Sequence, residues 1–219
     1  MATKAAYHHG NLKQALIAAA MKEIAADGIE AFSLRGVARR AGVSAPAVYR
    51  HFADKEALLV AVATQCAERL GAVMVEAVNT APAEPLEQFR ATGIATVRFA
   101  VAHPEHYRLI CMPGVLDAIP EPMRAKQKAF QDEQREKLRE AQAKGLIADL
   151  PLDDLLLTAQ ATVSGLAHAI IEGRLGDIDD ARAAELAIAV TGVLGVGLIP
   201  RDEDVADPYR KMVVRTKRR

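Results

Sequence analysis

A short run of polar and cationic residues in the first quarter of the chain has the types and spacing to contact nucleic acid. Tyr49, Arg50 and His51 follow one another, and Lys55 comes at the start of the next expected helix. Such side chains donate hydrogen bonds to base edges and phosphate oxygens, and a helix N-terminus beside a lysine attracts phosphate. The residues before them, 44–47, are small, so a helix carrying them could enter a groove closely.

Two short helices joined by a tight turn are needed to hold these side chains. Ser33 is expected to cap the first helix, and Gly42 to end it with a positive φ. Ser44 is expected to cap the second helix, with Pro46 in its first turn. This is the layout of a helix-turn-helix, whose second helix lies in the DNA major groove. A surface corner of two helices with a solvated polar face fits the same spacing. The groove-binding interpretation requires burial of Val37, Ala38, Val43, Val48 and Phe52.

The composition favours closely packed helices over a sheet. Of the 219 residues, 51% are hydrophobic but only 4% are aromatic, and there is no tryptophan, whereas sheets favour aromatic and β-branched residues. The apolar periodicity predicts an all-α fold. A first helix is expected from a cap at Asn11 to Gly28, and Asp54 is expected to cap the helix after the corner. That helix and the later ones are expected over about 55–79, 86–102, 105–111, 121–144, 153–175 and 179–198, with 112–120 a loop.

The zero net charge hides an uneven distribution. Residues 1–55 hold eight Lys and Arg against four Asp and Glu, and residues 56–200 hold thirteen against twenty. A basic N-terminal block on an acidic body suits nucleic acid at one end. No apolar run is expected to span a membrane, and the start lacks a secretion signal, so no membrane partner is expected. Two cysteines make no disulfide framework, and we expect a cytoplasmic protein.

Residues 7–62 resemble the N-terminal domain of the tetracycline-repressor-like (TetR) transcriptional regulators. The signature aromatic-x-His-Phe-x-x-Lys-x-x-Leu is present as Tyr49, His51, Phe52, Lys55 and Leu58. The resemblance implies an all-helical homodimer that represses transcription from a palindromic DNA operator and is released when a small-molecule effector binds its C-terminal domain. By position, the residues that match DNA-facing ones in that family are Ser33, Arg35, Ser44, Ala45, Ala47, Tyr49, Arg50, His51 and Lys55.

The remainder of the chain partly resembles a TetR subgroup marked by a Trp-x-x-x-His-Gly pattern. The supporting segments are 103–109 and 163–167, but the chain has no tryptophan, Ser164 stands in place of the histidine, and only Gly165 fits. The resulting division is a helix-turn-helix DNA-binding domain over 7–58, a helical ligand-binding and dimerisation domain over 59–200, and a charged tail over 201–219.

The last two helices are expected to form the dimer. Each carries an apolar face, and two such helices from each protomer would make a four-helix interface with two-fold symmetry. The alternative is that both faces belong to the core of one chain. The residues expected at the interface are Val163, Leu166, Ile170, Ala187, Val190 and Leu194.

A ligand pocket is expected among the helices of the C-terminal domain, because pockets combine apolar walls with a few polar groups. Its aromatic members and Met74, at helical spacing, are more often part of an ordinary core, and a histidine before a proline fits a helix end. The candidate lining residues are Met74, Phe89, Phe99, His103, His106, Tyr107, Cys111, Phe130 and Gln134.

The sequence gives only weak indications of a metal site or a redox switch. His8 and His9 suggest a metal, but adjacent imidazoles point apart and rarely chelate together. Cys66 and Cys111 suggest a redox switch, although thiols on apolar faces are usually inert. We expect neither a cofactor nor a metal. The alternative functions are a helical protein-interaction adaptor and a small all-α enzyme, the latter favoured only by two histidines, 103 and 106, near a glutamate.

Overall fold

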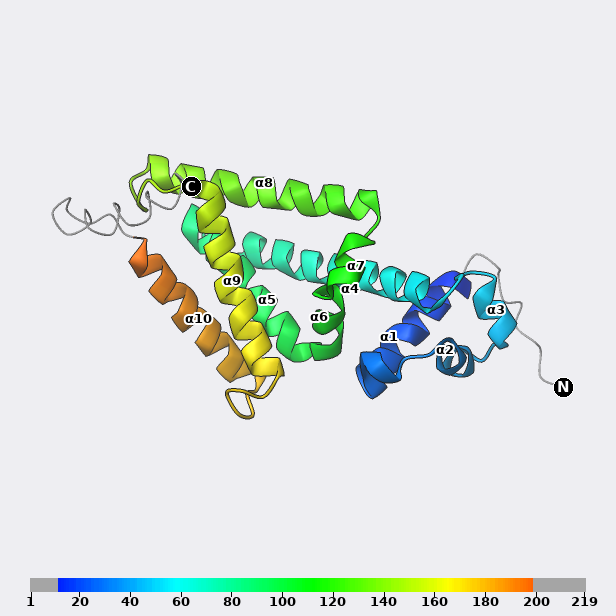
Figure 1. Cartoon of the computed structure of the whole chain (residues 1–219). Coiled ribbons are helices and arrows are strands. Elements are labelled where there is room, and N and C mark those ends of the chain that lie inside the picture. Colours follow the sequence, from blue (N-terminus) through cyan, green and yellow to red (C-terminus); the bar gives the residue numbers. More distant parts are fainter. Residues whose placement is uncertain (1–11, 199–219) are drawn as a thin grey trace, which may run out of the picture.

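The computed structural model describes residues 12–198, which form ten helices and no strand and thereby confirm the all-α prediction. The cap at Asn11, the histidines at 8 and 9, and the tail over 201–219 lie outside the described residues. Helices α1–α3 and the start of α4 form one end of the molecule, and α5–α10 form the other (Figure 1). The helices are α1 (Leu12–Ala31), α2 (Leu34–Ala41), α3 (Ala45–Tyr49), α4 (Lys55–Thr80), α5 (Pro85–Ala102), α6 (Pro104–Ile110), α7 (Pro113–Asp117), α8 (Glu121–Ala143), α9 (Leu152–Ile171) and α10 (Asp180–Gly197).

Local capping explains the corner between α2 and α3. The Ser33 hydroxyl accepts a hydrogen bond from the Gly36 backbone N–H at 3.1 Å and so caps α2. Gly42 ends that helix with a φ of +69°, which favours glycine, and lets the chain turn into α3. Asp54 caps α4 by accepting from the Ala57 N–H at 2.8 Å. Ser44 occupies the N-cap position of α3, but its side chain makes no capping hydrogen bond, contrary to expectation.

Two other boundaries differ from the sequence prediction. The expected loop over 112–120 contains a short helix, α7, whose first turn is closed by a hydrogen bond from the Val115 N–H to the Met112 carbonyl. Helix α9 ends at Ile171 rather than near residue 175, because Gly173 turns the chain with a φ of +72°. Glycine is the residue that adopts this conformation without steric cost.

A continuous core joins the two ends of the molecule. Buried side chains of α1, α2, α3, α4 and α6 form one cluster, which includes Leu16, Val37, Val48, Leu58 and Leu109. Helix α5 lies at the centre of the body and contacts α4, α8, α9 and α10. A second cluster joins α5, α9 and α10, and a third joins α5, α8 and α9. Helix α4 runs unbroken from the corner into the body, across the expected domain boundary at residue 58.

By length and composition alone, α4 and α9 are apolar enough to cross a membrane, which the sequence analysis did not expect. Core helices of a helical protein pass the same test. Both helices pack against α5 in the body, and α4 contributes Leu58, Val62 and Cys66 to the largest core cluster.

The two N-cap residues Asp54 and Ser44 give a pair of matched predictions about the free energy of unfolding. Asp54→Ala is expected to lower the free energy of unfolding by about 1 kcal/mol, because the Ala57 N–H loses its partner. Ser44→Ala is expected to change it by less than about 0.5 kcal/mol, because this side chain caps nothing. Urea denaturation followed by circular dichroism measures both. Equal losses would show that the capping bond at Asp54 does not contribute.

Candidate nucleic-acid interface and its link to the body

Most of the predicted DNA-contacting side chains are exposed around the corner of α2 and α3. Tyr49 is 56% exposed, although it is a large aromatic residue. Ala45 and His51 are half-buried. Ala47 is only 6% exposed and faces the protein interior, so the expectation that it lies on the outer face of α3 is wrong. The exposed members of the set are Ser33, Arg35, Ser44, Tyr49, Arg50 and Lys55.

The hydrophobic side of the corner is largely as expected. Val37, Ala38, Val48 and Phe52 are buried in the main core, whereas Val43 is half-buried and packs against it. The small side chain of the buried Ala47 lets α3 pack closely on the protein. The small side chain of the half-buried Ala45 adds little bulk on the side where DNA would approach. The alternation of buried and exposed side chains leaves one polar face of α3 open to solvent.

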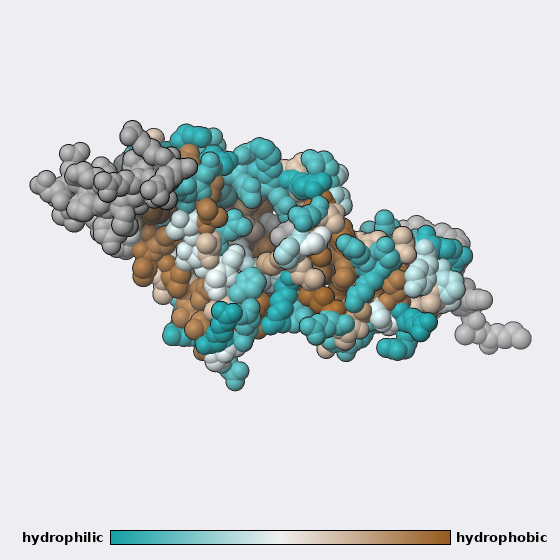
Figure 2. Space-filling model, in the orientation of Figure 1, coloured by the Kyte–Doolittle hydropathy of each residue, from teal (hydrophilic) through white to brown (hydrophobic). Residues whose placement is uncertain are grey.

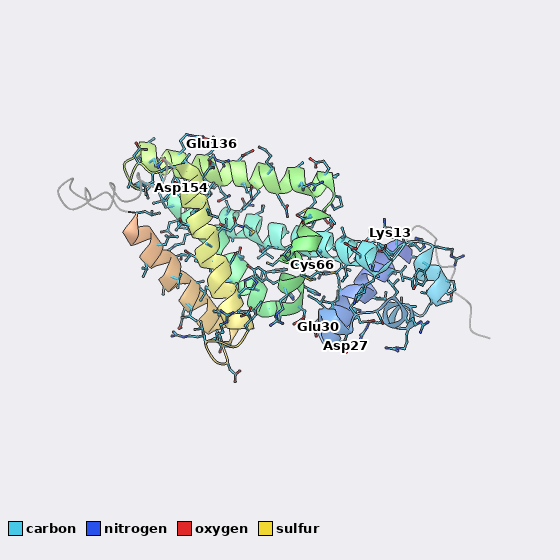
Figure 3. The ribbon with its side chains drawn as sticks, in the orientation of Figure 1. Lys13, Asp27, Glu30, Cys66, Glu136 and Asp154 are labelled. Atoms are coloured by element: carbon cyan, nitrogen blue, oxygen red, sulfur yellow. The ribbon has the colours of Figure 1, made fainter. Side chains whose placement is uncertain are left out.

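Aromatic rings position two cations at this end of the molecule. The Lys55 Nζ lies 5.6 Å from the centre of the Phe32 ring, and the Lys13 Nζ lies 5.7 Å from the centre of the Phe52 ring. Such cation–π contacts restrain a lysine while leaving its ammonium accessible. Lys13, on the first turn of α1 (Figure 3), was missed in the sequence analysis, because nothing in the local sequence predicts that it reaches Phe52.

Arg39 and Arg40 differ in a way that their adjacent positions do not reveal. Arg40 lies 3.2 Å from the Asp27 carboxylate and 3.9 Å from that of Glu23, so α1 neutralises its charge. Arg39 is exposed, and no ion pair or hydrogen bond of its side chain is seen among residues 12–198. Arg39 therefore adds a second cation, beside Arg35, to the exposed surface of α2.

A buried carboxylate fixes α2 against α1. Glu23 is 4% exposed, and its Oε1 accepts a hydrogen bond from the Ser33 N–H at 3.3 Å. Its carboxylate occupies the space above Gly36, where a β-carbon would lie only 2.6 Å from the Glu23 Cδ. Glu23 thus joins the start of α2, the glycine in its first turn and Arg40 in its last. The sequence analysis assigned no role to this residue.

Helix α6 connects the corner domain to the body. His106 is buried, and its Nε2 lies 3.0 Å from the Met21 carbonyl of α1, which makes Nε2 the donor. Arg108 pairs with Glu105 and donates to the Ile171 carbonyl at the end of α9. His106 is therefore hydrogen-bonded to α1, and its place in the lining of a pocket stays a prediction.

The other predicted pocket residues are spread over several environments. Phe99 and Tyr107 belong to the main core cluster, and the half-buried Cys111 packs against it. Burial raises the pKa of the Tyr107 hydroxyl to about 12. Phe89 packs against the cluster that joins α5, α8 and α9, and His103 is exposed. Met74 and Phe130 are half-buried.

Gln134 differs from the rest of the predicted pocket. It is 4% exposed, and neither its amide oxygen nor its amide nitrogen has a hydrogen-bond partner. A buried amide without partners is unfavourable, so its presence needs an explanation.

Part of the predicted dimer surface belongs to the core of the single chain. Ile170 and Ala187 are buried together with Val97 of α5, so their assignment to an interface is wrong. Val163 and Leu166 are half-buried against the same cluster. Packing against α5 uses this stripe of each helix, and a second apolar stripe faces outward.

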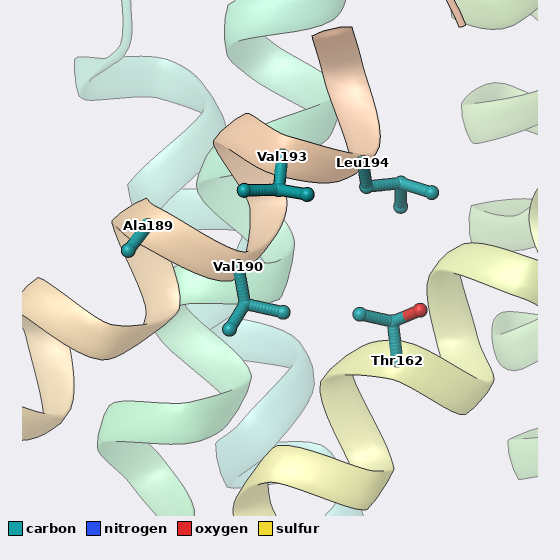
Figure 4. Close-up of a pocket in the computed structure, with 5 residues that line it drawn as sticks. All are labelled: Thr162, Ala189, Val190, Val193 and Leu194. Atoms are coloured by element: carbon teal, nitrogen blue, oxygen red, sulfur yellow. The ribbon is translucent and has the colours of Figure 1, made fainter. Parts of the chain in front are cut away.

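The outward stripe of α9 and α10 is strongly apolar. Leu157 is 66% exposed and Val193 is 74% exposed. Figure 2 shows hydrophobic residues gathered at this end of the molecule. A hollow of about 360 Å³ lies between the two helices, as Figure 4 shows, and its lining residues are Thr162, Ala189, Val190, Val193 and Leu194. Val190 and Leu194 were expected at the interface.

The groups considered for other chemistry have ordinary surroundings. Cys66 and Cys111 are free thiols, and burial raises the pKa of Cys66 to about 12, which keeps it protonated near neutral pH. His106 and Glu105 are held by Met21 and Arg108. Within the part of the chain that the structure describes, no three His, Cys, Asp or Glu side chains gather as metal ligands would.

Comparisons with known proteins agree with the geometry. Residues 16–62 match the family model "Bacterial regulatory proteins, tetR family", and residues 89–192 match "Tetracyclin repressor-like, C-terminal domain". A search of the curated proteins finds no match. A solved structure from Rhodococcus sp. RHA1, described as a protein with unknown function, is 32% identical, with a TM-score of 0.74 over 90% of this chain and 100% of that one.

Two further solved structures share the fold. A TetR family transcription regulator from Marinobacter aquaeolei VT8 is 18% identical, with a TM-score of 0.65 over 88% of this chain and 97% of that one. The TetR family regulator PfmR from Thermus thermophilus is 24% identical, with a TM-score of 0.59 over 85% and 96%. The two family models cover both the corner with its exposed cations and the helical body, and the chain belongs to the TetR family of transcriptional regulators.

Proposed function

We propose that the chain is a cytoplasmic, ligand-responsive repressor that binds a palindromic operator as a homodimer and is released by a small-molecule effector. The observation that carries this proposal is the polar, cationic face of the corner between α2 and α3. Gly42 makes the turn tight, and the buried Val48 leaves Tyr49 and Arg50 facing solvent. The family membership supports the same function.

The exposed residues of the corner divide into two roles. Lys55 and Arg35 are near the N-termini of α4 and α2, where the helix dipole adds to their attraction for phosphate. Ser44, Tyr49 and Arg50 lie on or beside α3 and are the side chains proposed to reach base edges, with the half-buried Ala45 and His51 beside them. Ala47 is not included, because it is buried.

The proposed dimer uses the outward stripe of α9 and α10. Its apolar residues are too exposed for a stable monomer surface, and the hollow between the helices would accept side chains of a second copy. A two-fold axis through this stripe relates two recognition helices, as a palindrome requires. Proper docking would set them one turn of DNA, about 34–36 Å, or a multiple of it apart.

Release by an effector requires that the body and the corner influence each other. Helix α6 supports this requirement, because His106 contacts α1 while Arg108 contacts the end of α9. DNA would favour one arrangement of the two recognition helices and effector another, so each ligand weakens binding of the other.

The test is a mobility-shift titration of the purified chain against duplexes from the DNA that flanks its gene. We expect a specific complex whose affinity falls steeply as salt rises, because phosphate binding releases counterions. Retention of no duplex at low salt would contradict DNA binding and favour the adaptor function. A complex that ignores salt would contradict the proposed phosphate contacts.

Lys55→Ala tests the phosphate-binding role. It is expected to weaken binding to specific and random duplexes alike, by roughly fivefold per half-site, because a cation beside the α4 N-terminus is lost. The slope of log affinity against log salt is expected to fall by about 1 per site. Lys128→Ala, an exposed lysine on α8, is the control and is expected to change neither quantity. A loss confined to the specific duplex would assign Lys55 to base reading instead.

A further inference from the structure

The amide of Gln134 is the most unusual polar group inside the body. Its Oε1 and Nε2 are both buried and unpartnered, although a primary amide can donate two hydrogen bonds and accept two. Another glutamine on the same helix shows the contrast. The Gln142 Nε2 donates to the carbonyls of Ala148, at 3.1 Å, and Leu150, at 2.7 Å.

Gln134 lies on the face of α8 that packs into the body. Phe130, Gln134 and Leu138 are spaced by four residues, so they share one side of the helix. Leu138 is buried against Leu155 and Phe89, from α9 and α5. An apolar residue at position 134 would therefore suit this stripe better, and the buried, unpartnered amide is expected to lower the stability of the fold.

Among the described residues, the remaining interior of the body offers few polar groups and no buried carboxylate. Two half-buried residues bury one unpartnered atom each, Gln65 Oε1 and Arg90 Nε, and the Arg90 guanidinium is paired with Glu87 at 2.8 Å. Among the described residues, the buried polar side chains of the body are Thr92, His106 and Gln134. The Thr92 hydroxyl donates to the Phe89 carbonyl at 2.7 Å, and His106 is engaged with α1. The only buried carboxylate among residues 12–198, Glu23, belongs to α1. A cation in this interior would have no counter-charge, which is costly.

We propose that Gln134 is the polar anchor of the effector site, and that the effector is a small neutral molecule with an apolar body and one amide-like edge. This inference rests on the proposed function, because it assigns chemistry to the effector of that regulator. The Gln134 amide donates through Nε2 to a carbonyl and accepts through Oε1 from an N–H or O–H. A carboxamide, a lactam or an undissociated acid presents such a pair. The walls of the proposed effector site are the apolar residues beside Gln134 on α8 and those of α5.

The first experiment measures the thermal unfolding of two matched variants, Gln134→Leu and Gln142→Leu, without any ligand. Gln134→Leu is expected to raise Tm by at least about 2 °C, because it removes a buried unpartnered amide from an apolar stripe. Gln142→Leu is expected to lower Tm by a similar amount, because it removes the two hydrogen bonds that the amide donates to the carbonyls of Ala148 and Leu150. If Gln134→Leu lowers Tm as Gln142→Leu does, the amide already has a partner, such as a bound water, and the proposal is overturned.

The second experiment identifies the class of ligand by thermal shift and calorimetry. The probes are straight-chain carboxamides from butanamide to decanamide, with the matched carboxylates and alkylammonium ions. We expect at least one carboxamide to bind, its carboxylate and ammonium to bind at least tenfold more weakly, and Gln134→Leu to lose at least tenfold in carboxamide affinity. Stronger binding of the ammonium or the carboxylate, equal binding to Gln134→Leu, or no binding by any carboxamide would each overturn the proposal.

A mobility-shift measurement of operator binding by the wild type distinguishes a failure of this inference from a failure of the proposed function. Neither experiment above involves DNA, so a wild type that fails to bind any duplex contradicts the proposed function and leaves the ligand readouts intact.

Discussion

Val193→Asp is expected to convert the protein into a folded monomer with at least about a hundredfold lower operator affinity, equivalent to about 2.7 kcal/mol. The side chain is 74% exposed on α10, so the free energy of unfolding of the single chain should change by less than about 0.5 kcal/mol. In the proposed dimer, two carboxylates related by the two-fold axis would be buried against apolar side chains. The cost of burying an unpaired charge makes this the largest effect that we predict.

Sedimentation equilibrium measures the oligomeric state of this variant, and a mobility shift measures its operator affinity. Val75→Asp is the matched control, because Val75 is also an exposed valine, 48% accessible, but lies on α4. The control is expected to remain dimeric and to bind as the wild type does. A dimeric Val193→Asp with normal operator affinity would show that the outward stripe of α9 and α10 is not the interface.

Gly36→Ala is expected to destabilise the corner domain by about 1–3 kcal/mol. The new β-carbon would lie 2.6 Å from the Glu23 Cδ, and closer still to Oε1, so the carboxylate must leave its place beside the Ser33 N–H. This loss outweighs the gain of about 1 kcal/mol that alanine brings to a helix interior. Operator affinity is expected to fall as well, because Glu23 fixes the start of α2, which carries Ser33 and Arg35.

The double variant Glu23→Ala, Gly36→Ala provides the internal control. Without the carboxylate the methyl group has room, so the double variant is expected to be more stable than Gly36→Ala alone, with a coupling energy of at least about 1 kcal/mol. Urea denaturation of the four proteins completes the cycle, and mobility shifts at a temperature where all are folded measure DNA binding. Additive effects would mean that Glu23 and Gly36 do not share one space.

Local signals in the sequence predicted the corner well. Ser33, Gly42 and Asp54 act within four residues of the groups they cap, so their roles can be deduced from short spacing. The helix ends that were misplaced depend on context. Helix α7 forms in a segment with a proline and a glycine, residues that usually indicate a loop, and Gly173 shortened α9 within a continuous apolar pattern.

Contacts between distant segments could not be predicted in this way. Periodicity showed that α9 and α10 are apolar, but not which stripe packs on α5, and therefore Ile170 and Ala187 were assigned to the wrong surface. The same limit applies to Ala47, where a small side chain is compatible with either face of α3. Glu23 above Gly36 and His106 beside Met21 join different helices, and nothing in the local sequence indicates either pair.

In the proposed regulator, the unbroken course of α4 would make it a lever between the effector site and the operator. Its 26 residues span about 39 Å, with Lys55 at one end and Thr80 at the other. A tilt of about 5° about the Thr80 end would displace Lys55 by about 3.4 Å, the axial step from one base pair to the next along a strand. The proposed two-fold partner would rotate in the opposite sense. A rotation too small to disturb the packing of the body would then be enough to move both recognition helices out of register with the major groove.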